Sequence, residues 1–283
     1  MGSRIAADGR WEGRTGAEWR RVLGAPAVRA RGVVGSTNDE ARAWAGQGAP
    51  AGALVIADAQ TDGRGRSGDK WWSPPGLSLY LSAVLRPARV PGAGAAVGVV
   101  SLRVGLALAA ALEDAFSLDT RIKWPNDLLG PGGGKLAGVL CEAAFKADQL
   151  EYVIAGVGVN VGHDVASLPE EIRETATSVA HETGGAALRP ALLTALAPRL
   201  AGLATAPLEP LSPEELLALD ARDALKGRAV RVDGGPELVA LGMDRGGALR
   251  VAHPSGAITL VQAGRVRPVQ TRVGGGAHTR RLE

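Results

Sequence analysis

The sequence predicts an α+β fold: a mixed, largely antiparallel sheet with helices, followed by a small all-β barrel. The apolar runs 135–144 and 150–161 are long, strand-like and joined by a short polar segment, which is typical of an antiparallel meander. From Gly227 onward, four short apolar runs recur between glycine turns at a spacing of roughly ten residues, which is typical of a small barrel or sandwich. Between these regions, 168–219 has a helical pattern.

Composition excludes several classes of protein. The chain has 283 residues, 46% of them hydrophobic, and a formal net charge of +3 without any long Lys/Arg run, so it does not resemble a nucleic-acid polycation. A lone Cys141 allows no intramolecular disulfide or zinc cluster and fits a reducing, cytoplasmic setting. We see no signal peptide. The apolar stretch 93–112 carries Arg103 at its middle, so we expect a buried helix and no membrane span.

The other elements follow in chain order. Residues 1–14 are polar and glycine-rich, and we expect them to be frayed. We expect strands at 28–34, 53–56 and 77–85, a helix at 15–23, a helix that begins near residue 40, and a long helix at 95–116. Because proline cannot donate to a sheet ladder, Pro125 indicates a bend between two short strands in 121–129. Later helices should begin near Ser167, Arg189 and Ser212.

The change of pattern after the last helix divides the chain. We place a boundary near Leu225, with a larger domain over 1–225 and a small barrel over 226–270. The segment 271–283 is glycine-rich and charged, and we expect a disordered tail there. The residues that suggest chemistry all precede this boundary.

The glycine–arginine loop, residues 57–72, is the most suggestive stretch. It carries Gly63-Arg64-Gly65-Arg66, then Lys70 and the pair Trp71-Trp72, between two apolar runs. Glycine lets a backbone approach a ligand, arginine offers forked donors to carboxylates and phosphates, and tryptophan offers a flat face. The composition predicts a loop that closes over an anionic ligand carrying a ring. The alternative is a solvated loop with scattered charge.

Further polar residues interrupt or follow the apolar runs. Ser36-Thr37-Asn38 either caps a helix or forms a donor-rich ligand site at its N-terminus. Pairing across a short hairpin would bring Lys123 and Lys135 together; either a bound anion neutralises them or Asp127 and Glu142 do so. Asn126-Asp127 suits nucleotide hydroxyls or Mg²⁺.

Glycines in the run 156–160 indicate that a flat group approaches that strand, and Asn160 supplies an amide at its end. We find neither a Ser-His-Asp arrangement nor a Walker A sequence. Electrostatic clamping of phosphate and carboxylate groups is therefore favoured over covalent catalysis.

Taken in order, these residues resemble the biotin protein ligase family. The resemblance covers roughly residues 29–268, and the terminal barrel resembles the family's SH3-like domain. It implies a catalytic domain of the class II synthetase-like, biotin–lipoate ligase type. The segment before Val28 is too short for the DNA-binding helix-turn-helix of some members, so we expect a monofunctional ligase that binds no operator DNA. The motifs are Ser36-Thr37-Asn38, Gln60 with Gly63-Arg64-Gly65-Arg66-x-Gly68, Lys123-Trp124-Pro125-Asn126-Asp127, Lys135-Leu136-Ala137-Gly138-Val139-Leu140 and Gly156-x-Gly158-x-Asn160.

The resemblance implies a two-step reaction. Biotin and MgATP would give biotinyl-5′-AMP and pyrophosphate, and a lysine of a biotin carboxyl carrier domain of a carboxylase would then take the biotin and release AMP. The implied catalytic residues are Arg66, Lys123 and Lys135. Implied biotin-binding residues are Ser36, Thr37, Asn38, Gln60, Gly63, Arg64, Gly65, Arg66, Lys135 and Gly138. Implied ATP-binding residues are Arg66, Trp71, Lys123, Asn126 and Asn160, with Trp71 stacked on adenine and Asp127 on Mg²⁺.

One residue departs from the family pattern, and two other interpretations stay open. Asp69 stands where the family commonly has a basic residue, so it could weaken phosphate contacts unless Lys70 offsets it. A lipoate ligase or octanoyltransferase would share the catalytic fold, and a non-enzymatic binding module would share the terminal barrel. The Gly-Arg-Gly-Arg loop argues against the first, and the near-balanced charge argues against the second. The resemblance leaves monomer and homodimer both possible.

Overall fold

The protein's computed structural model describes residues 9–88, 96–147 and 149–269. The expected tail, 271–283, lies outside the described residues, as does the first half of the expected frayed segment. The second half was wrongly expected to fray, because β1 (Arg10–Trp11) and β2 (Arg14–Thr15) pair as a small hairpin. Trp11 is buried against Trp19, with ring centroids 5.3 Å apart, and the Trp19 indole donates to the Trp11 carbonyl at 2.9 Å.

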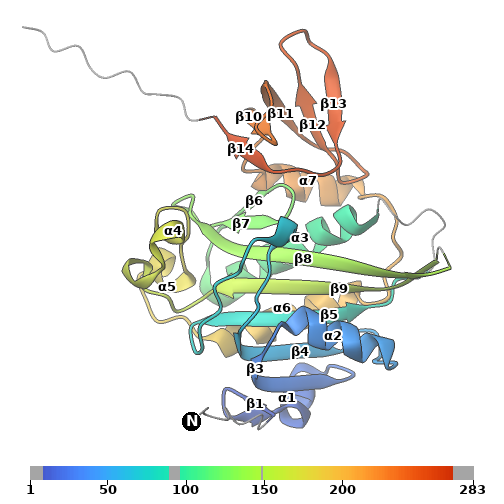
Figure 1. Ribbon diagram of the computed structural model, residues 1–283, viewed down its shortest axis with the longest axis vertical. Coiled ribbons are helices and arrows are strands. Elements are labelled where there is room, and N and C mark those ends of the chain that lie inside the picture. Colours follow the sequence, from blue (N-terminus) through green and yellow to red (C-terminus); the bar gives the residue numbers. More distant parts are fainter. Residues whose placement is uncertain (1–8, 89–95, 148, 270–283) are drawn as a thin grey trace, which may run out of the picture.

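A seven-stranded sheet forms the body of the molecule (Figure 1). β3 and β4 are parallel and every other neighbouring pair is antiparallel, which confirms a mixed, largely antiparallel sheet. The parallel pair needs a crossover, which α2 (Thr37–Gly46) supplies. In spatial order the strands are β3 (Val28–Val34), β4 (Leu54–Gln60), β5 (Ser78–Leu85), β9 (Gln149–Asn160), β8 (Lys135–Lys146), β7 (Asp127–Leu129) and β6 (Arg121–Lys123).

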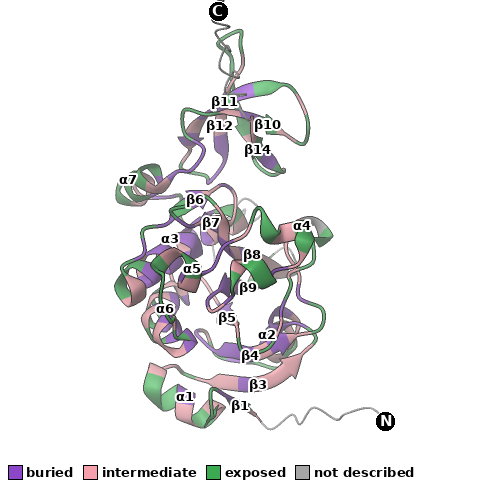
Figure 2. Cartoon of the chain, turned by 90° about the vertical axis from the view of Figure 1, so that its left-hand side faces the viewer, coloured by how far each residue is buried: buried purple, intermediate pink, exposed green. Residues whose placement is uncertain are grey.

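Helices cover both faces of this sheet. α3 (Ala96–Phe116) and α6 (Arg189–Leu203) pack on the face that holds the main core, and α2 packs on the other face. Figure 2 shows buried residues along the central strands and exposed ones on the outer sides of the helices. The expected apolar helix is α3, whose Arg103 pairs with Glu215 at 2.6 Å. No helix in the described part of the chain has both the length and the apolar character to cross a membrane.

Local capping signals set where several helices begin. α1 (Gly16–Leu23) begins at a capping box of Thr15 and Glu18, and α7 (Pro213–Arg222) begins at one of Ser212 and Glu215. The helices expected at Arg189 and Ser212 are confirmed, although α6 begins at Arg189 without a side-chain cap. Near Ser167 the chain forms the 3-10 turn η3 (Val165–Ser167) and then the short helix α4 (Glu170–Arg173), which begins where a helix was expected. α5 (Val179–Thr183) lies within the expected helical stretch 168–219, although its start was not expected.

A second, five-stranded antiparallel sheet follows α7 (Figure 1, top). It consists of β13 (Ile258–Val261), β12 (Leu249–Ala252), β11 (Glu237–Met243), β10 (Ala229–Val232) and β14 (Val266–Pro268), in that spatial order. Four of these strands were expected, and β14 was not. The Trp124 indole donates to the Gly247 carbonyl at 2.9 Å and so ties this sheet to the turn between β6 and β7. The boundary near Leu225 stays a prediction.

Candidate active site

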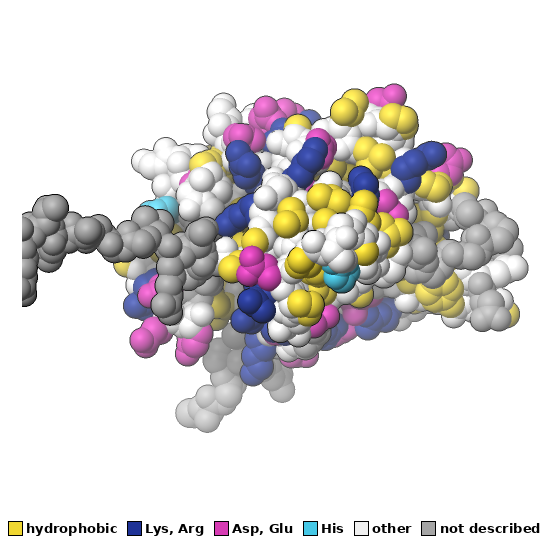
Figure 3. Space-filling view, turned by 90° about the horizontal axis from the view of Figure 1, so that it is seen from above, with side chains coloured by type: hydrophobic (Ala, Val, Ile, Leu, Met, Phe, Trp, Pro, Cys, Tyr) yellow, Lys and Arg dark blue, Asp and Glu magenta, His cyan; other side chains and the backbone are white. Residues whose placement is uncertain are grey.

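A cavity of about 250 Å³ lies where the large sheet, the glycine–arginine loop and the C-terminal sheet meet. Seven of its lining side chains are basic and two are acidic, so the cavity suits an anion. The lining residues are Ser36, Thr37, Asn38, Gln60, Arg64, Gly65, Arg66, Asp69, Lys70, Trp71, Lys123, Trp124, Pro125, Asn126, Asp127, Lys135, Gly138, Val139, Leu140, Gly156, Val157, Gly158, Gly264, Arg265, Val266 and Arg267. The outer surface differs: seen from the C-terminal sheet, basic and acidic side chains are intermixed (Figure 3).

Two glycines form a flat platform for Trp71. Gly138 of β8 and Gly158 of β9 are cross-strand partners, and the indole ring lies against both. A Cβ atom at Gly158 would approach the ring to 2.8 Å, and one at Gly138 to 3.2 Å. The Lys135 ammonium lies 5.3 Å from the ring centroid. The flat group expected over this strand therefore includes a side chain of the protein itself.

The first helical residues of α2 bind neighbouring side chains of the sheet. The Thr37 amide donates to Gln60 Oε1 at 2.8 Å. Asn38 is buried, donates to Glu142 at 2.6 Å and accepts from the Ser82 hydroxyl at 2.6 Å. Its amide fills the space over Gly156, where a Cβ would come within 2.2 Å of Asn38 Oδ1. Asn38 is therefore a structural partner of β5 and β8 at the cavity wall.

Ser36 occupies the N-cap position, yet its side chain makes no capping hydrogen bond. It lines the cavity beside Thr37 and Gln60. Of the two interpretations, the geometry favours a polar ligand wall over a simple cap. The Gln60 amide group also donates to Ser73 at 3.1 Å, which fixes the direction of its side chain.

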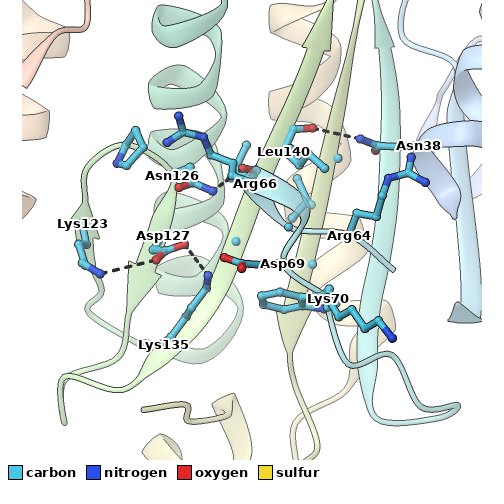
Figure 4. Close-up of a pocket in the computed structure, with 18 of the residues that line it drawn as sticks. Asn38, Arg64, Arg66, Asp69, Lys70, Lys123, Asn126, Asp127, Lys135 and Leu140 are labelled. Carbon is cyan, nitrogen blue, oxygen red and sulfur yellow. Dashed lines mark hydrogen bonds and ion pairs between the residues drawn. The ribbon is translucent and has the colours of Figure 1, made fainter. Parts of the chain in front are cut away.

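The side chains of Arg64 and Arg66 point in different directions (Figure 4). The Arg64 guanidinium makes two hydrogen bonds to Asp39, at 2.6 and 2.7 Å. These bonds raise the pKa of Arg64 and lower the pKa of Asp39. We expected Arg64 to serve the ligand; it lines the cavity, and its guanidinium ties the loop to α2.

Arg66 extends over the cavity toward Asn126 (Figure 4). Burial lowers the pKa of Arg66, against the opposing charges of Asp127 and Asp233. Among the described residues no carboxylate forms an ion pair with it. A half-buried guanidinium without such a partner is available to an anionic ligand.

Asp127 lies between the two lysines of the cavity. Its carboxylate is 2.6 Å from the Lys135 ammonium and 3.9 Å from that of Lys123, its cross-strand partner. Burial lowers the pKa of Lys123, and Asp127 opposes that shift. The alternative that carboxylates of the protein neutralise the two lysines therefore holds for Asp127. It does not hold for Glu142, which pairs with Arg42 at 2.6 Å.

Two expected site residues lie outside the cavity lining. The Asn160 side chain is buried, and its Nδ2 atom donates to the Thr177 carbonyl at 3.0 Å. Gly63 is held inside the loop: its carbonyl accepts from the Trp71 amide at 2.9 Å, and a Cβ there would meet Ser73 Oγ at 2.5 Å. Both positions shape the site without facing it.

The C-terminal sheet contributes residues that the sequence interpretation missed. Gly264, Arg265, Val266 and Arg267 line the cavity, and Arg265 donates to Asp69 at 2.6 Å. The two arginines of this short run were the available signal. They were missed because the terminal strands were treated as a separate barrel.

Comparisons with known proteins agree with this geometry. The profile of the Biotin/lipoate A/B protein ligase family matches residues 33–160. A biotin–[acetyl-CoA-carboxylase] ligase of Paracoccus denitrificans is 39% identical over 169 residues, which is 59% of this chain and 68% of that protein. This chain belongs to the biotin protein ligase family.

Two further relatives extend the comparison. A bifunctional ligase/repressor of Bacillus subtilis is 37% identical over 156 residues, 54% of this chain; the chain spans about half the length of that relative, 46%. The structure of a biotin protein ligase from Aquifex aeolicus in complex with biotin and ATP superposes with a TM-score of 0.70 and 26% identity. It covers 86% of this chain and 99% of that one, which confirms the fold.

Proposed function

We propose that the protein is an ATP-dependent biotin protein ligase. It would activate biotin to biotinyl-5′-AMP and transfer it to a lysine of a biotin carboxyl carrier domain of an acyl-CoA carboxylase. One observation carries the proposal: the conjunction of a loop arginine with two strand lysines around one cavity. Arg66, Lys123 and Lys135 all line it, beside the polar wall of Ser36 and Gln60.

The polar wall suits the uncharged end of biotin. Ser36, Thr37 and Gln60 offer hydroxyl and amide groups to a ureido ring, and the backbone at Gly65 can approach the ligand because it has no side chain. Gly138 acts indirectly, because the room that it leaves is taken by the Trp71 ring. At the other end, the glycine platform covers one face of Trp71, so adenine would stack on the opposite face.

The basic residues suit the chemistry of adenylation. A biotin carboxylate oxygen would form a bond to the α-phosphorus of ATP while the bond to pyrophosphate breaks. Negative charge then grows on the phosphate oxygens, where Arg66, Lys123 and Lys135 would stabilise it. In the second step a carrier-lysine amine attacks the carbonyl of the mixed anhydride, loses a proton, and AMP leaves.

Magnesium fits the site only in part. Asp127 already faces two ammonium groups, and the described residues hold no group of three or more acidic, histidine or cysteine side chains placed to bind a metal ion. Mg²⁺ prefers several oxygen ligands and keeps some of its waters. We propose that it arrives with the ATP phosphates, whose charge it offsets, and that Asp127 and Asn126 lie beside them.

A transfer assay tests this function. The protein would be incubated with MgATP, a carrier domain and either biotin, lipoate or octanoate, and the mass of the carrier would be measured. We expect the mass of one biotinyl group, its loss in Lys123→Gln, and its retention in Lys146→Gln, which changes an exposed lysine at the far end of β8. Transfer of lipoate or octanoate without biotin would overturn the proposal.

Three further expectations stay predictions. The carrier domain is the proposed partner, operator DNA is expected not to bind, and the chain is expected to act in the cytoplasm as a monomer or homodimer. Sedimentation with and without biotin and ATP would distinguish the two oligomeric states, and a DNA shift assay would test the second expectation.

A further inference from the structure

Asp69 and Arg265 join the glycine–arginine loop to the C-terminal sheet. Arg265 Nη2 donates to Asp69 Oδ1 at 2.6 Å, and 196 residues separate the two in the chain. Both side chains line the cavity, and both are more than half exposed. This contact bridges the cavity mouth from the loop to the second sheet.

Arg265 is held in place by its own backbone. Its amide donates to Asp233 Oδ1 at 2.8 Å, and its carbonyl accepts from the Asp233 amide at 2.9 Å. The preceding Gly264 has φ of +140°, and a Cβ there would meet the Asp233 carboxylate at 2.7 Å. The turn therefore requires glycine and presents Arg265 at a defined position.

Asp69 is equally constrained at the tip of the loop. It follows the turn η1 (Arg66–Gly68), its amide donates to the Arg66 carbonyl at 3.1 Å, and its carbonyl accepts from Gly65 at 2.7 Å. Arg64 and Lys70 bridge the base of this tip. A contact that holds the Asp69 carboxylate therefore also restrains the segment that carries Arg66.

We propose that Asp69 and Arg265 are a positioning pair that holds the tip of the loop closed over the cavity and so slows escape of the adenylate. The role in adenylate retention rests on the proposed function. The Arg64–Asp39 contact holds the base of the tip to α2, and the Asp69–Arg265 contact holds its far side to the C-terminal sheet. Arg66 lies between the two anchors without a carboxylate partner of its own among the described residues.

This pair also accounts for the acidic residue at position 69. A carboxylate beside a phosphate site would repel the ligand, yet here its charge is directed to Arg265. An exposed ion pair is weak and screened by salt, so we expect a modest effect that high salt removes. The expected change in opening is about two- to fivefold.

A double-mutant cycle on the full chain tests the pair without requiring activity. Asp69→Asn, Arg265→Gln and the double variant would each be digested briefly with trypsin, and cleavage within 64–70 would be timed. We expect each single variant to be cut about two- to fivefold faster than the wild type, and the double variant to be cut no faster than either single variant. In 1 M NaCl the wild type should approach the variants. Arg250→Gln, on β12 outside the cavity lining, is the matched control.

A second readout separates positioning from general stability. Asp69→Glu should preserve slow cleavage. The reversed pair Asp69→Lys with Arg265→Glu adds a trypsin site, so it is followed by hydrogen exchange of the loop amides, which should return toward the wild-type rate. Release of bound biotinyl-5′-AMP should follow the same order. Additive effects of the single variants, or unchanged cleavage, would overturn the proposal. If the cycle couples but no adenylate forms, the contact stands and the proposed function fails.

Discussion

At the scale of single residues, the position of Trp71 depends on two glycines, which have no side chain to displace its ring. Gly138 and Gly158 leave the sheet flat beneath the indole, and Lys135 lies near its ring. The same ring would stack on adenine in the proposed reaction. A change at the platform should therefore affect both packing and nucleotide binding.

We expect Gly158→Ala to weaken ATP binding and to lower the free energy of unfolding by about 1–3 kcal/mol, the usual cost of overpacking. The added methyl group would lie 2.8 Å from the Trp71 ring, so the ring must move. Urea denaturation and ATP titration measure the two effects. Gly162→Ala is the control, because its nearest neighbouring atoms are 3.9 Å away. Equal behaviour of the two variants would contradict the platform.

Arg66 is the loop residue that we expect to act on the ligand directly. Arg66→Ala removes a half-buried guanidinium that can form charge-assisted hydrogen bonds, each worth roughly 1.5–3 kcal/mol. We expect biotinyl-5′-AMP to leave about tenfold faster or more. Filter retention of radiolabelled adenylate would measure this release. Unchanged retention would show that the loop does not hold the adenylate through Arg66.

At the scale of elements, the glycine–arginine loop is organised by the helix beside it. Asp39 in the first turn of α2 accepts two hydrogen bonds from Arg64, and the neighbouring Asn38 donates to Glu142 of β8. α2 therefore supports the polar wall of the cavity and the base of the loop at once. A carboxylate near a helix N-terminus is also favoured by the helix dipole.

The Arg64–Asp39 contact should act as one unit. Arg64→Gln and Asp39→Asn are each expected to speed hydrogen exchange of loop amides by about two- to fivefold, since each removes the same partly exposed pair. The double variant should match the single ones. Exchange of amides in β5 serves as the internal reference. Effects that add would mean that the two residues stabilise the loop independently.

At the scale of the whole molecule, the C-terminal sheet completes one side of the cavity. Trp124 in the β6–β7 turn donates a hydrogen bond to the Gly247 carbonyl, and Arg265 donates one to Asp69 of the glycine–arginine loop. His163, which follows β9, is buried. Its Nε2 atom lies 2.6 Å from the Ser78 hydroxyl, and its ring centroid lies 5.1 Å from that of Trp72. Trp72 is the last residue of the glycine–arginine loop, so this buried histidine supports the loop's end.

His163 should make stability depend on pH. Burial lowers the pKa of His163 to about 4, whereas an unfolded histidine titrates near 6.5. The folded state therefore binds fewer protons: its stability is fully present above about pH 6.5 and is lost as the pH falls toward 4, by up to roughly 3 kcal/mol. Urea denaturation at several pH values across this window gives the free energy of unfolding. We expect this free energy to fall less steeply with decreasing pH for His163→Asn than for the wild type. His253→Gln, which changes a partly buried histidine that follows β12 of the second sheet, is the matched control.

Much of the fold was predictable because its signals are local. β3 spans the expected residues 28–34, and α7 begins at the expected Ser212-Pro213-Glu214-Glu215 box, since capping and alternation act within a few residues. The hairpin of β1 and β2 was missed because it depends on the packing of Trp11 against Trp19. Most of the expected site residues line the cavity, because the family motifs mark those positions.

The sequence by itself determined which chemical groups this protein brings to its site: a glycine-arginine loop, two lysines, an indole and a polar helix start. Only the tertiary structure decided what each group faces. Arg64 binds Asp39, Asp69 binds Arg265, and Asp127 separates the two lysines. The reason is physical: a charged side chain turns to the nearest opposite charge in space, and that partner can lie 25 or 196 residues away along the chain.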